Sequence, residues 1–261
     1  MNLLEPLIRA EAGTFALEAV RLSGLVVAAP LAWSAAPARV KVALVLLLAV
    51  AAHGHSQLDP EIGGSPERIA LAVGSEFALG IAIGFIVRLV VAAFEVAAEQ
   101  ASIMMGLGIA QVFDPQSDTS HNVLGSVFKN FALLIAFAVG LHRLVIGATI
   151  SSFQVVPVGS LTRLDAYGPT FLTLGGELLA TGLRLAMPIM AVLFMTQVGL
   201  AFVSRAAPAM QIFSVGFAVT LGVGALVLFL TLPDLAYEAA IEMSRVEGRI
   251  ERLLNDAVET R

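Results

Sequence analysis

The stretch IALAVGSEFALGIAIGFIVRLVVAAFEVAAEQASIMM, residues 69–105, decides which kind of fold this chain can form. It is apolar over most of its length and predicts one long helix. A membrane-spanning helix needs about 20 predominantly apolar residues, and this stretch is much longer. Its charged residues are Glu76, Arg88, Glu95 and Glu99. Charges inside a membrane are destabilising unless they face protein or water. We therefore expect that this helix is not a simple lipid-facing span and that its charged side chains face protein or water.

Both the start and the surface of this helix have recognisable signals. Ser65 and Pro66 precede it, and they suit the N-cap and the first helical position. Gly80 and Gly84 form a GxxxG step, on which the backbone of a second helix can approach closely. We therefore expect a tightly packed helical neighbour at these two glycines.

The composition of the whole chain points to a membrane protein or to an obligate part of an apolar assembly. Of its 261 residues, 58% are apolar and 13% are charged, and the mean hydropathy is +0.89. A soluble domain is about 45–50% apolar and about 25% charged. The net charge of −5 gives no indication of a nucleic-acid partner. The absence of cysteine excludes disulfides and thiolate metal sites, and the N-terminal residues predict no cleaved signal peptide.

Further apolar segments on both sides predict an all-α fold. Pro188 is expected to kink the helix that contains it, and Arg205-Ala206-Ala207-Pro208 is expected to end that helix. The last apolar segment is expected to end at Pro233. Besides residues 69–105, the expected helices cover residues 14–33, 40–52, 122–151, 174–204 and 210–232.

The C-terminal segment, residues 234–261, has a different character. Its apolar residues recur at three- and four-residue steps and charges cover the other face, which predicts an amphipathic helix. The sequence leaves open whether this helix lies at a membrane interface, docks to a partner or is an ordinary surface helix. The apolar residues are Leu235, Ala239, Met243, Val246, Ile250, Leu253 and Leu254.

Charged residues within the apolar helices are the first set of candidate functional residues. They could tie helices together between subunits or line a conduit, and both interpretations stay open. Glu18 and Arg21 are spaced to pair along one helix, as residues three apart can. Glu95 and Glu99 would repel each other unless they are hydrated or separately paired. The full set is Glu18, Arg21, Glu76, Arg88, Glu95, Glu99, Glu177, Arg184 and Arg205.

No catalytic or nucleotide-binding apparatus is visible in the sequence. There is no GxSxG elbow, and the glycine-rich segments lack the lysine of a P-loop. His53 and His55 could contribute to a metal site, but no further ligand has a suitable spacing, so a polar helix end is the favoured interpretation. We expect no enzyme activity, no metal and no cofactor.

The segment MMGLGIAQVFDPQSDTS, residues 104–120, is the second candidate. Its two glycines free the backbone, its first half is apolar, and its second half contains turn-forming polar residues. Irregular backbone at membrane depth is tolerated only inside protein or against water. The segment is therefore either a pore plug or a simple external loop. The candidate plug residues are Met104, Met105, Gly106, Leu107, Gly108, Ile109, Gln111, Val112, Phe113, Asp114 and Pro115.

Across nearly its whole length the chain resembles the FliR family of flagellar export-gate proteins, which is similar to the T component of virulence type III secretion systems. Arg205-Ala206-Ala207-Pro208 and the following Phe213, Gly216 and Phe217 are the most specific part of the resemblance. The resemblance rests on RLSGLVVAAPLAWSAAPARVKVAL (21–44), residues 76–120, GLHRLVIGATISSFQVVPVG (140–159) and residues 183–224.

This resemblance implies a structural role in protein export. FliR-like proteins join FliP and FliQ in a channel for unfolded substrates, with FlhB and FlhA around it, at the flagellar basal body in the bacterial inner membrane. The resemblance implies a single domain over residues 1–261 built from hydrophobic helical hairpins, with FliP-like helices in 1–160 and FliQ-like helices plus the amphipathic helix in 161–261. It also implies that the loop 106–120 projects into the channel and helps to close it.

Two other classes of protein compete with this interpretation. A small-solute secondary transporter would use a helix broken at Pro188 and paired glycine-rich segments. An intramembrane hydrolase is disfavoured, because the sequence shows no Ser–His arrangement and no pair of aspartates within its helices.

Overall fold

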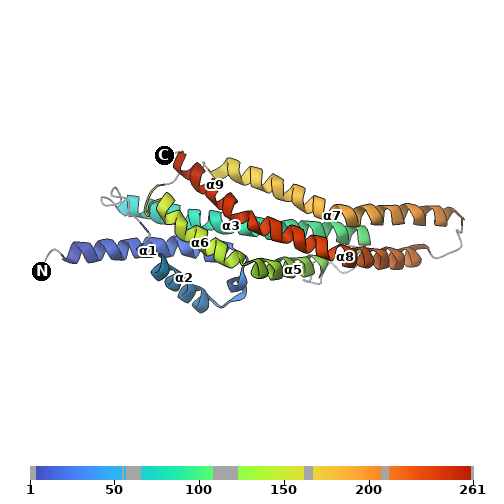
Figure 1. Ribbon diagram of the computed structural model, residues 1–261, viewed down its shortest axis with the longest axis horizontal. Coiled ribbons are helices and arrows are strands. Elements are labelled where there is room, and N and C mark those ends of the chain that lie inside the picture. Colours follow the sequence, from blue (N-terminus) through green and yellow to red (C-terminus); the bar gives the residue numbers. More distant parts are fainter. Residues whose placement is uncertain are drawn as a thin grey trace. The chain divides into compact units, whose positions relative to one another are not determined.

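The computed structural model describes residues 4–54, 56, 66–107, 123–161, 167–206 and 212–259. These residues form helices and no β-strand, which confirms the predicted all-α class. Figure 1 shows the course of the chain through them. The helices are α1 (Leu4–Ala28), the short 3-10 helix η1 (Ala32–Ala35), α2 (Ala38–Ala52), α3 (Pro66–Met105), α5 (Val123–Val139), α6 (Leu141–Val155), α7 (Tyr167–Ala206), α8 (Ile212–Ser244) and α9 (Val246–Glu259).

The long helix α3 matches the prediction closely. It begins at Pro66 and ends at Met105, after which Gly106 adopts a φ of +79°. The amide of Gly106 donates to the carbonyl of Ile103 over 3.1 Å, and the amide of Leu107 donates to that of Ser102 over 3.1 Å. These two bonds form a Schellman motif, which satisfies carbonyls at the helix end and favours glycine at its left-handed position.

Other boundaries differ from the prediction for identifiable reasons. α1 begins at Leu4 and not at residue 14, and Pro6 is tolerated because it lies in the first turn, where amides have no helical partner. α1 ends at Ala28, since the residue before Pro30 disfavours helical geometry. The expected single helix 122–151 is divided at Gly140, whose φ is +81°.

The two internal prolines do not end their helices. α7 is continuous through Pro188 and ends at Ala206, within the predicted Arg205-Ala206-Ala207-Pro208 stop. α8 continues through Pro233 to Ser244, so the predicted end at Pro233 is wrong. Proline within a membrane helix is tolerated where neighbouring groups satisfy the backbone, so the residue type alone does not decide the helix end.

The chain divides into two compact units. Unit 1 is Met1–Leu89, Gly140–Gly175 and Met243–Arg261, and unit 2 is Val90–Val139 and Gly176–Glu242. In unit 1, α1 and α2 pack together, and α6 contributes to their apolar core. The buried members of this core are Leu17, Leu22, Leu48, Ala49, Ala52, Phe153 and Val158.

The core of unit 2 forms around the end of α3. Ala101 and Met105 of α3 cluster with Ile189 and Leu193 of α7. A Cβ placed on Gly224 of α8 would lie 2.6 Å from Cγ of Met105, so this glycine makes room for the methionine. The end of α3 is therefore held by both α7 and α8.

The GxxxG step of α3 packs against α1 in unit 1, as its spacing predicts. A Cβ on Gly80 would overlap the carbonyl oxygen of Arg21, and a Cβ on Gly84 would lie 2.8 Å from that of Ala28. Gly24 of α1 provides the matching gap, because a Cβ there would overlap the carbonyl oxygen of Phe77. The close approach of the two backbones depends on glycine at these positions.

The amphipathic C-terminal segment packs within the chain, and the apolar residues of its predicted face are all buried. In unit 1, α9 lies beside α6 (Figure 1). The apolar face of α9 covers another helix of the same protein. This packing favours the interpretation of α9 as an ordinary surface helix.

Among the described helices, three stretches are long and apolar enough to cross a membrane. They are Pro66–Met105, Gly168–Ala206 and Val215–Asp256, and α5 with α6 is a fourth candidate if this bent pair is one span. The composition and these helices together identify an all-α membrane protein.

Candidate functional site

A buried ion pair joins α1 to α3 in unit 1. Nε of Arg21 donates to Oε2 of Glu76 over 2.6 Å, and Nη2 donates to Oε1 over 3.1 Å. The two side chains are 0% and 1% exposed. This bidentate geometry is the strong form of an arginine–carboxylate contact, since the planar guanidinium matches both oxygens.

Further bonds extend this pair to α6 and to the turn that follows it. Nη1 of Arg21 donates to Oγ of Ser152 over 3.0 Å, and Nη2 also donates to the carbonyl of Val156 over 3.0 Å. The amide of Gly159 donates to Oε1 of Glu76 over 2.8 Å. The guanidinium carbon of Arg21 lies 4.4 Å from the ring centroid of Phe153, which is a cation–π contact.

We call Arg21, Glu76, Ser152, Val156 and Gly159 the polar cluster. A buried charge is tolerated when it is paired and hydrogen-bonded, and both charges here have several partners. The residues of the polar cluster are buried, so within this chain they join α1, α3 and α6 and do not line an open path.

The expected pairing of Glu18 with Arg21 is wrong. Arg21 binds Glu76, and Oε2 of Glu18 lies 3.2 Å from Nδ1 of His53 at the end of α2. The hydroxyl of Ser56 also donates to Glu18. The physical reason is that Glu76, on a helix that crosses α1 closely, offers Arg21 both of its carboxylate oxygens.

His53 lies between two carboxylates. Its Nε2 is 3.1 Å from Oε2 of Glu11, and its ring makes an edge contact with Phe15 at 5.9 Å between centroids. The hydrogen bond with Glu18 raises the pKa of His53 above its ordinary value, and Glu11 acts in the same direction. A protonated imidazole can donate from both nitrogens, so the arrangement favours the charged form. His55, its neighbour in the sequence motif, lies outside the described residues.

The other predicted charges fall into two groups. Glu95 is separately paired, because Nζ of Lys129 on α5 lies 3.2 Å from its Oε1. The second group is exposed on the long apolar helices α3 and α7. Its members are Arg88, Glu99, Glu177, Arg184 and Arg205.

The beginning of the candidate plug segment is anchored in unit 2. Met105 is buried, and Met104 and Leu107 pack against the same core. Nε2 of Gln197 on α7 donates to the carbonyl of Met104 over 3.1 Å. The remaining candidate plug residues lie outside the described part of the chain. These are Gly108, Ile109, Gln111, Val112, Phe113, Asp114 and Pro115.

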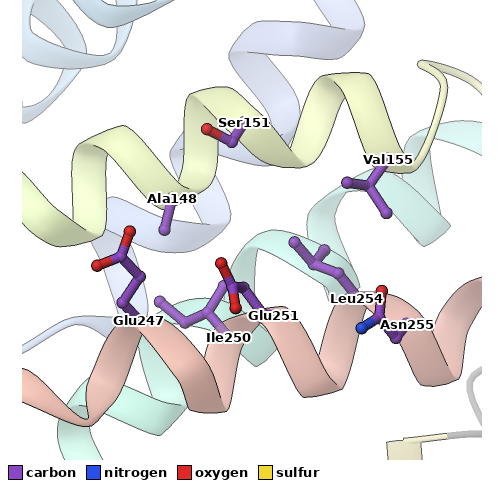
Figure 2. Close-up of a pocket in the computed structure, with 8 residues that line it drawn as sticks. All are labelled: Ala148, Ser151, Val155, Glu247, Ile250, Glu251, Leu254 and Asn255. Carbon is purple, nitrogen blue, oxygen red and sulfur yellow. The ribbon is translucent and has the colours of Figure 1, made fainter.

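A groove of about 250 Å³ lies between α6 and α9 in unit 1. Figure 2 shows Ala148, Ser151 and Val155 on one helix and the α9 residues, among them Glu247 and Glu251, on the other. We call it the acidic groove, because the charged side chains that line it are those two carboxylates. Among the described residues no group of three or more histidine or acidic side chains is arranged to hold a metal ion.

The sequence alone does not point to most of the polar cluster. Ser152, Val156 and Gly159 are far from Arg21 in sequence, and two of them contribute backbone atoms, which any residue type supplies. The prediction also omits Gly24 as the partner of the GxxxG step. A signal for Gly24 is present, because it follows Arg21 by three residues and therefore shares its helix face.

Comparisons with known proteins agree with the resemblance in the sequence. The family model described as "Bacterial export proteins, family 1" matches residues 12–246. The flagellar biosynthetic protein FliR of Escherichia coli (strain K12) is 30% identical over 219 residues, 83% of each chain. FliR of Bacillus subtilis (strain 168) is 26% identical over 231 residues, which cover 84% of this chain and 85% of the relative. The match along most of the chain confirms the resemblance, and the protein belongs to the FliR family of bacterial export proteins.

Proposed function

We propose that this chain is a structural, non-enzymatic subunit of the flagellar type III protein export gate in the bacterial inner membrane. It would form, with FliP and FliQ, the channel for unfolded substrates at the flagellar basal body, with FlhB and FlhA around it. The strongest support is the match to a flagellar biosynthetic protein over 83% of the chain. In this proposal residues 1–160 form FliP-like helices, and residues 161–261 form FliQ-like helices and the amphipathic C-terminal helix.

The lengths of the helices support an assembly over a simple bundle in lipid. α3 and α7 have 40 residues each. At 1.5 Å per residue each helix is about 60 Å long, which is twice the hydrocarbon thickness of about 30 Å. Much of each helix must therefore lie in water or against protein.

The surface of α7 and α8 supports the same view. Large apolar side chains are exposed on both helices, while Arg184 is exposed in the middle of α7. A charge in hydrocarbon is destabilising, whereas a partner subunit can both cover the apolar residues and pair with the charge. The exposed apolar residues include Phe194, Met195, Phe202, Leu226, Phe229 and Leu230.

The proposal includes a closing role for the loop 106–120. A constriction lined by apolar side chains excludes ions because they cannot keep their hydration shells. The anchoring of Met105 and Leu107 and the Schellman bonds at Gly106 would fix the base of such a loop. The part beyond Leu107 would then form the closing element.

Deletion of the loop tests its closing role. Residues 108–120 are replaced by a short Gly-Ser linker, which leaves the Schellman motif of α3 intact. We expect the gate to assemble and the membrane to become permeable to ions, measured as conductance in planar bilayers or as salt sensitivity of cells. Assembly with unchanged conductance would reject the closing role and leave the subunit proposal intact.

Purification tests the class of function. A gate subunit should assemble into a defined complex when FliP and FliQ are co-expressed and should move no solute by itself, whereas a small-solute transporter should be active alone. The continuity of α7 through Pro188 weakens the transporter alternative, which relies on a broken helix there. A monodisperse single chain that moves a solute into liposomes would overturn the proposal.

A further inference from the structure

His53 lies at the end of α2 and connects that helix to two successive turns of α1. Its amide donates to the carbonyl of Ala49 over 2.9 Å, so the last turn of α2 holds its backbone. Nδ1 lies 3.2 Å from Oε2 of Glu18, and Nε2 lies 3.1 Å from Oε2 of Glu11. The two glutamates are about two helical turns apart, so they lie on one face of α1. One imidazole therefore bridges two carboxylates of the same helix.

The two carboxylates differ in how much they need this contact. The side chain of Glu18 is 0% exposed, and its hydrogen-bond partners are the imidazole of His53 and the hydroxyl of Ser56. The side chain of Glu11 is 71% exposed, so water can solvate it. A buried charge that loses a donor is far more destabilising than an exposed one. When His53 has a single N–H, we therefore expect it to donate to Glu18.

The number of N–H donors on His53 depends on its protonation. The imidazolium form donates from both nitrogens, whereas the neutral form donates from one nitrogen and accepts at the other. If the neutral ring keeps its N–H on Nδ1, then Nε2 presents a lone pair to the carboxylate of Glu11. Two acceptors cannot form a hydrogen bond, so the contact between His53 and Glu11 is lost.

The surroundings of His53 leave this role to its own proton. The titratable groups that act on it are Glu11 and Glu18, both from α1. The two charged residues of α2 lie in its first turn, at the opposite end of that helix. α6 packs against the core of unit 1 with apolar side chains, and Glu76 of α3 is bound to Arg21. The bridge to Glu11 therefore depends on the protonation of His53.

We propose that His53 is a proton-dependent clamp on α1: the protonated ring holds both Glu11 and Glu18, and the neutral ring holds Glu18 and releases Glu11. The hydrogen bond with Glu18, followed by that with Glu11, raises the pKa of His53 above its ordinary value of about 6.5. The clamp is closed below about pH 6.5 and opens as the pH rises through the folded pKa. Its release removes a contact between the beginning of α1 and α2, so the turns of α1 that precede Phe15 should open more often.

Hydrogen–deuterium exchange of the purified full-length chain, with its partners if they are needed for stability, measures this opening. Protection factors of the segment 4–15, corrected for the intrinsic exchange rate, are followed in a pH series that begins below about 6.5 and rises through the transition. We expect the protection of the wild-type segment to fall about two- to fivefold, the range that a partly exposed ion pair supplies. In His53→Gln the protection should not change with pH.

Two substitutions of Glu11 separate the clamp from a general effect of pH. In Glu11→Gln the contact should persist at every pH, because an amide group accepts from imidazolium and donates to neutral imidazole. The protection should therefore stay high throughout the series. In Glu11→Ala the contact is absent at every pH, so the protection should stay low. Glu11 is exposed, so neither substitution removes a buried group.

The control is Glu251→Gln, which removes an exposed carboxylate of α9. It should leave the pH dependence of the segment 4–15 as in the wild type. The same fall in protection in the wild type and in Glu11→Gln would overturn the proposal. So would a wild-type protection that did not change with pH, because His53 would then hold Glu11 without its proton or not hold it at all.

Discussion

At the scale of single residues, Arg21 and Glu76 form a buried ion pair that joins two helices of unit 1. Arg21→Leu leaves the buried carboxylate of Glu76 without its counter-charge, and removal of one partner of a buried pair destabilises a protein by about 3–5 kcal/mol. Glu76→Gln should also be destabilising, because it leaves the buried guanidinium of Arg21 without its counter-charge and with one acceptor fewer, although the amide oxygen can still accept from the amide of Gly159. Denaturant titration of the purified chain in detergent measures both changes in the free energy of unfolding.

The control for this pair lies on the same helix as Glu76. Arg88 is exposed on α3, so Arg88→Leu should change the free energy of unfolding of the isolated chain by less than about 1 kcal/mol. If Arg88→Leu and Arg21→Leu were equally harmful, the polar cluster would have no special role in stability.

His53 predicts a pH dependence of stability. Its pKa is raised in the folded chain, chiefly by the hydrogen bond with Glu18, so its contribution is complete below the ordinary value of about 6.5. The contribution is lost as the pH rises through the folded pKa, which lies above that value. The melting temperature should therefore fall as the pH rises from about 6.5 through the folded pKa, and His53→Gln should reduce this fall.

The effect of His53 is expected to be modest. Its side chain is 37% exposed and that of Glu11 is 71% exposed, so water and salt weaken their interaction. Glu251→Gln is the matched control, since it removes an exposed carboxylate that lines the acidic groove on α9. A melting temperature that fell equally with pH in the wild type and in His53→Gln would contradict the prediction.

At the scale of helices, the crossing of α1 and α3 depends on Gly80. The methyl group of Gly80→Ala would meet the backbone carbonyl of Arg21, which cannot move aside without shifting α1. We expect a loss of stability of about 1–3 kcal/mol or more, the usual cost of overpacking a core. Gly74→Ala on the same helix has nothing within 4 Å of the new methyl group. This control should be neutral or slightly stabilising, because alanine is the better helix former.

The sequence predicts the long helices well and their interruptions poorly. α3 is predicted closely, since a long apolar run bounded by Pro66 and Gly106 has few alternatives. The division at Gly140 is not predicted, because glycine also occurs within apolar helices, and only the observed φ of +81° shows that this one separates two helices. Pro233 is the opposite case. It is predicted to end a helix, but it lies inside α8, because neighbouring groups can compensate for a proline within a helix.

The same limit applies to the candidate site. The charges of Arg21 and Glu76 inside apolar helices show that each needs a partner, but not which one, because the choice depends on the crossing at Gly80. The contacts of Val156 and Gly159 are made by backbone atoms, which nearly every residue type has. The sequence therefore cannot predict them. The loop 106–120 is predicted to be irregular from its first residue, and the structure shows that Gly106 and Leu107 cap a helix.

At the scale of the whole molecule, exposed charges on long apolar helices distinguish a subunit from a self-sufficient protein. Arg184 lies near the centre of the 40-residue helix α7 and is exposed. Since the side chain of Arg184 is exposed, its replacement by leucine removes no buried contact within the chain. Arg184→Leu should therefore leave the melting temperature of the isolated chain nearly unchanged. If Arg184 pairs with a partner subunit, the same substitution should lower the yield of the complex with FliP and FliQ severalfold.

Size-exclusion chromatography of the co-expressed proteins measures that yield. Comparing the yields of the wild type and Arg184→Leu decides whether this charge ties subunits together or lines a conduit. Arg39→Leu, which removes an exposed arginine of the separate helix α2, is the control and should assemble normally. A loss of complex in Arg184→Leu alone would place this charge at a contact between subunits, because only a lost partner lowers assembly without lowering the stability of the chain. Normal assembly by Arg184→Leu would mean that the charge faces water, and the conduit interpretation would then replace the inter-subunit one.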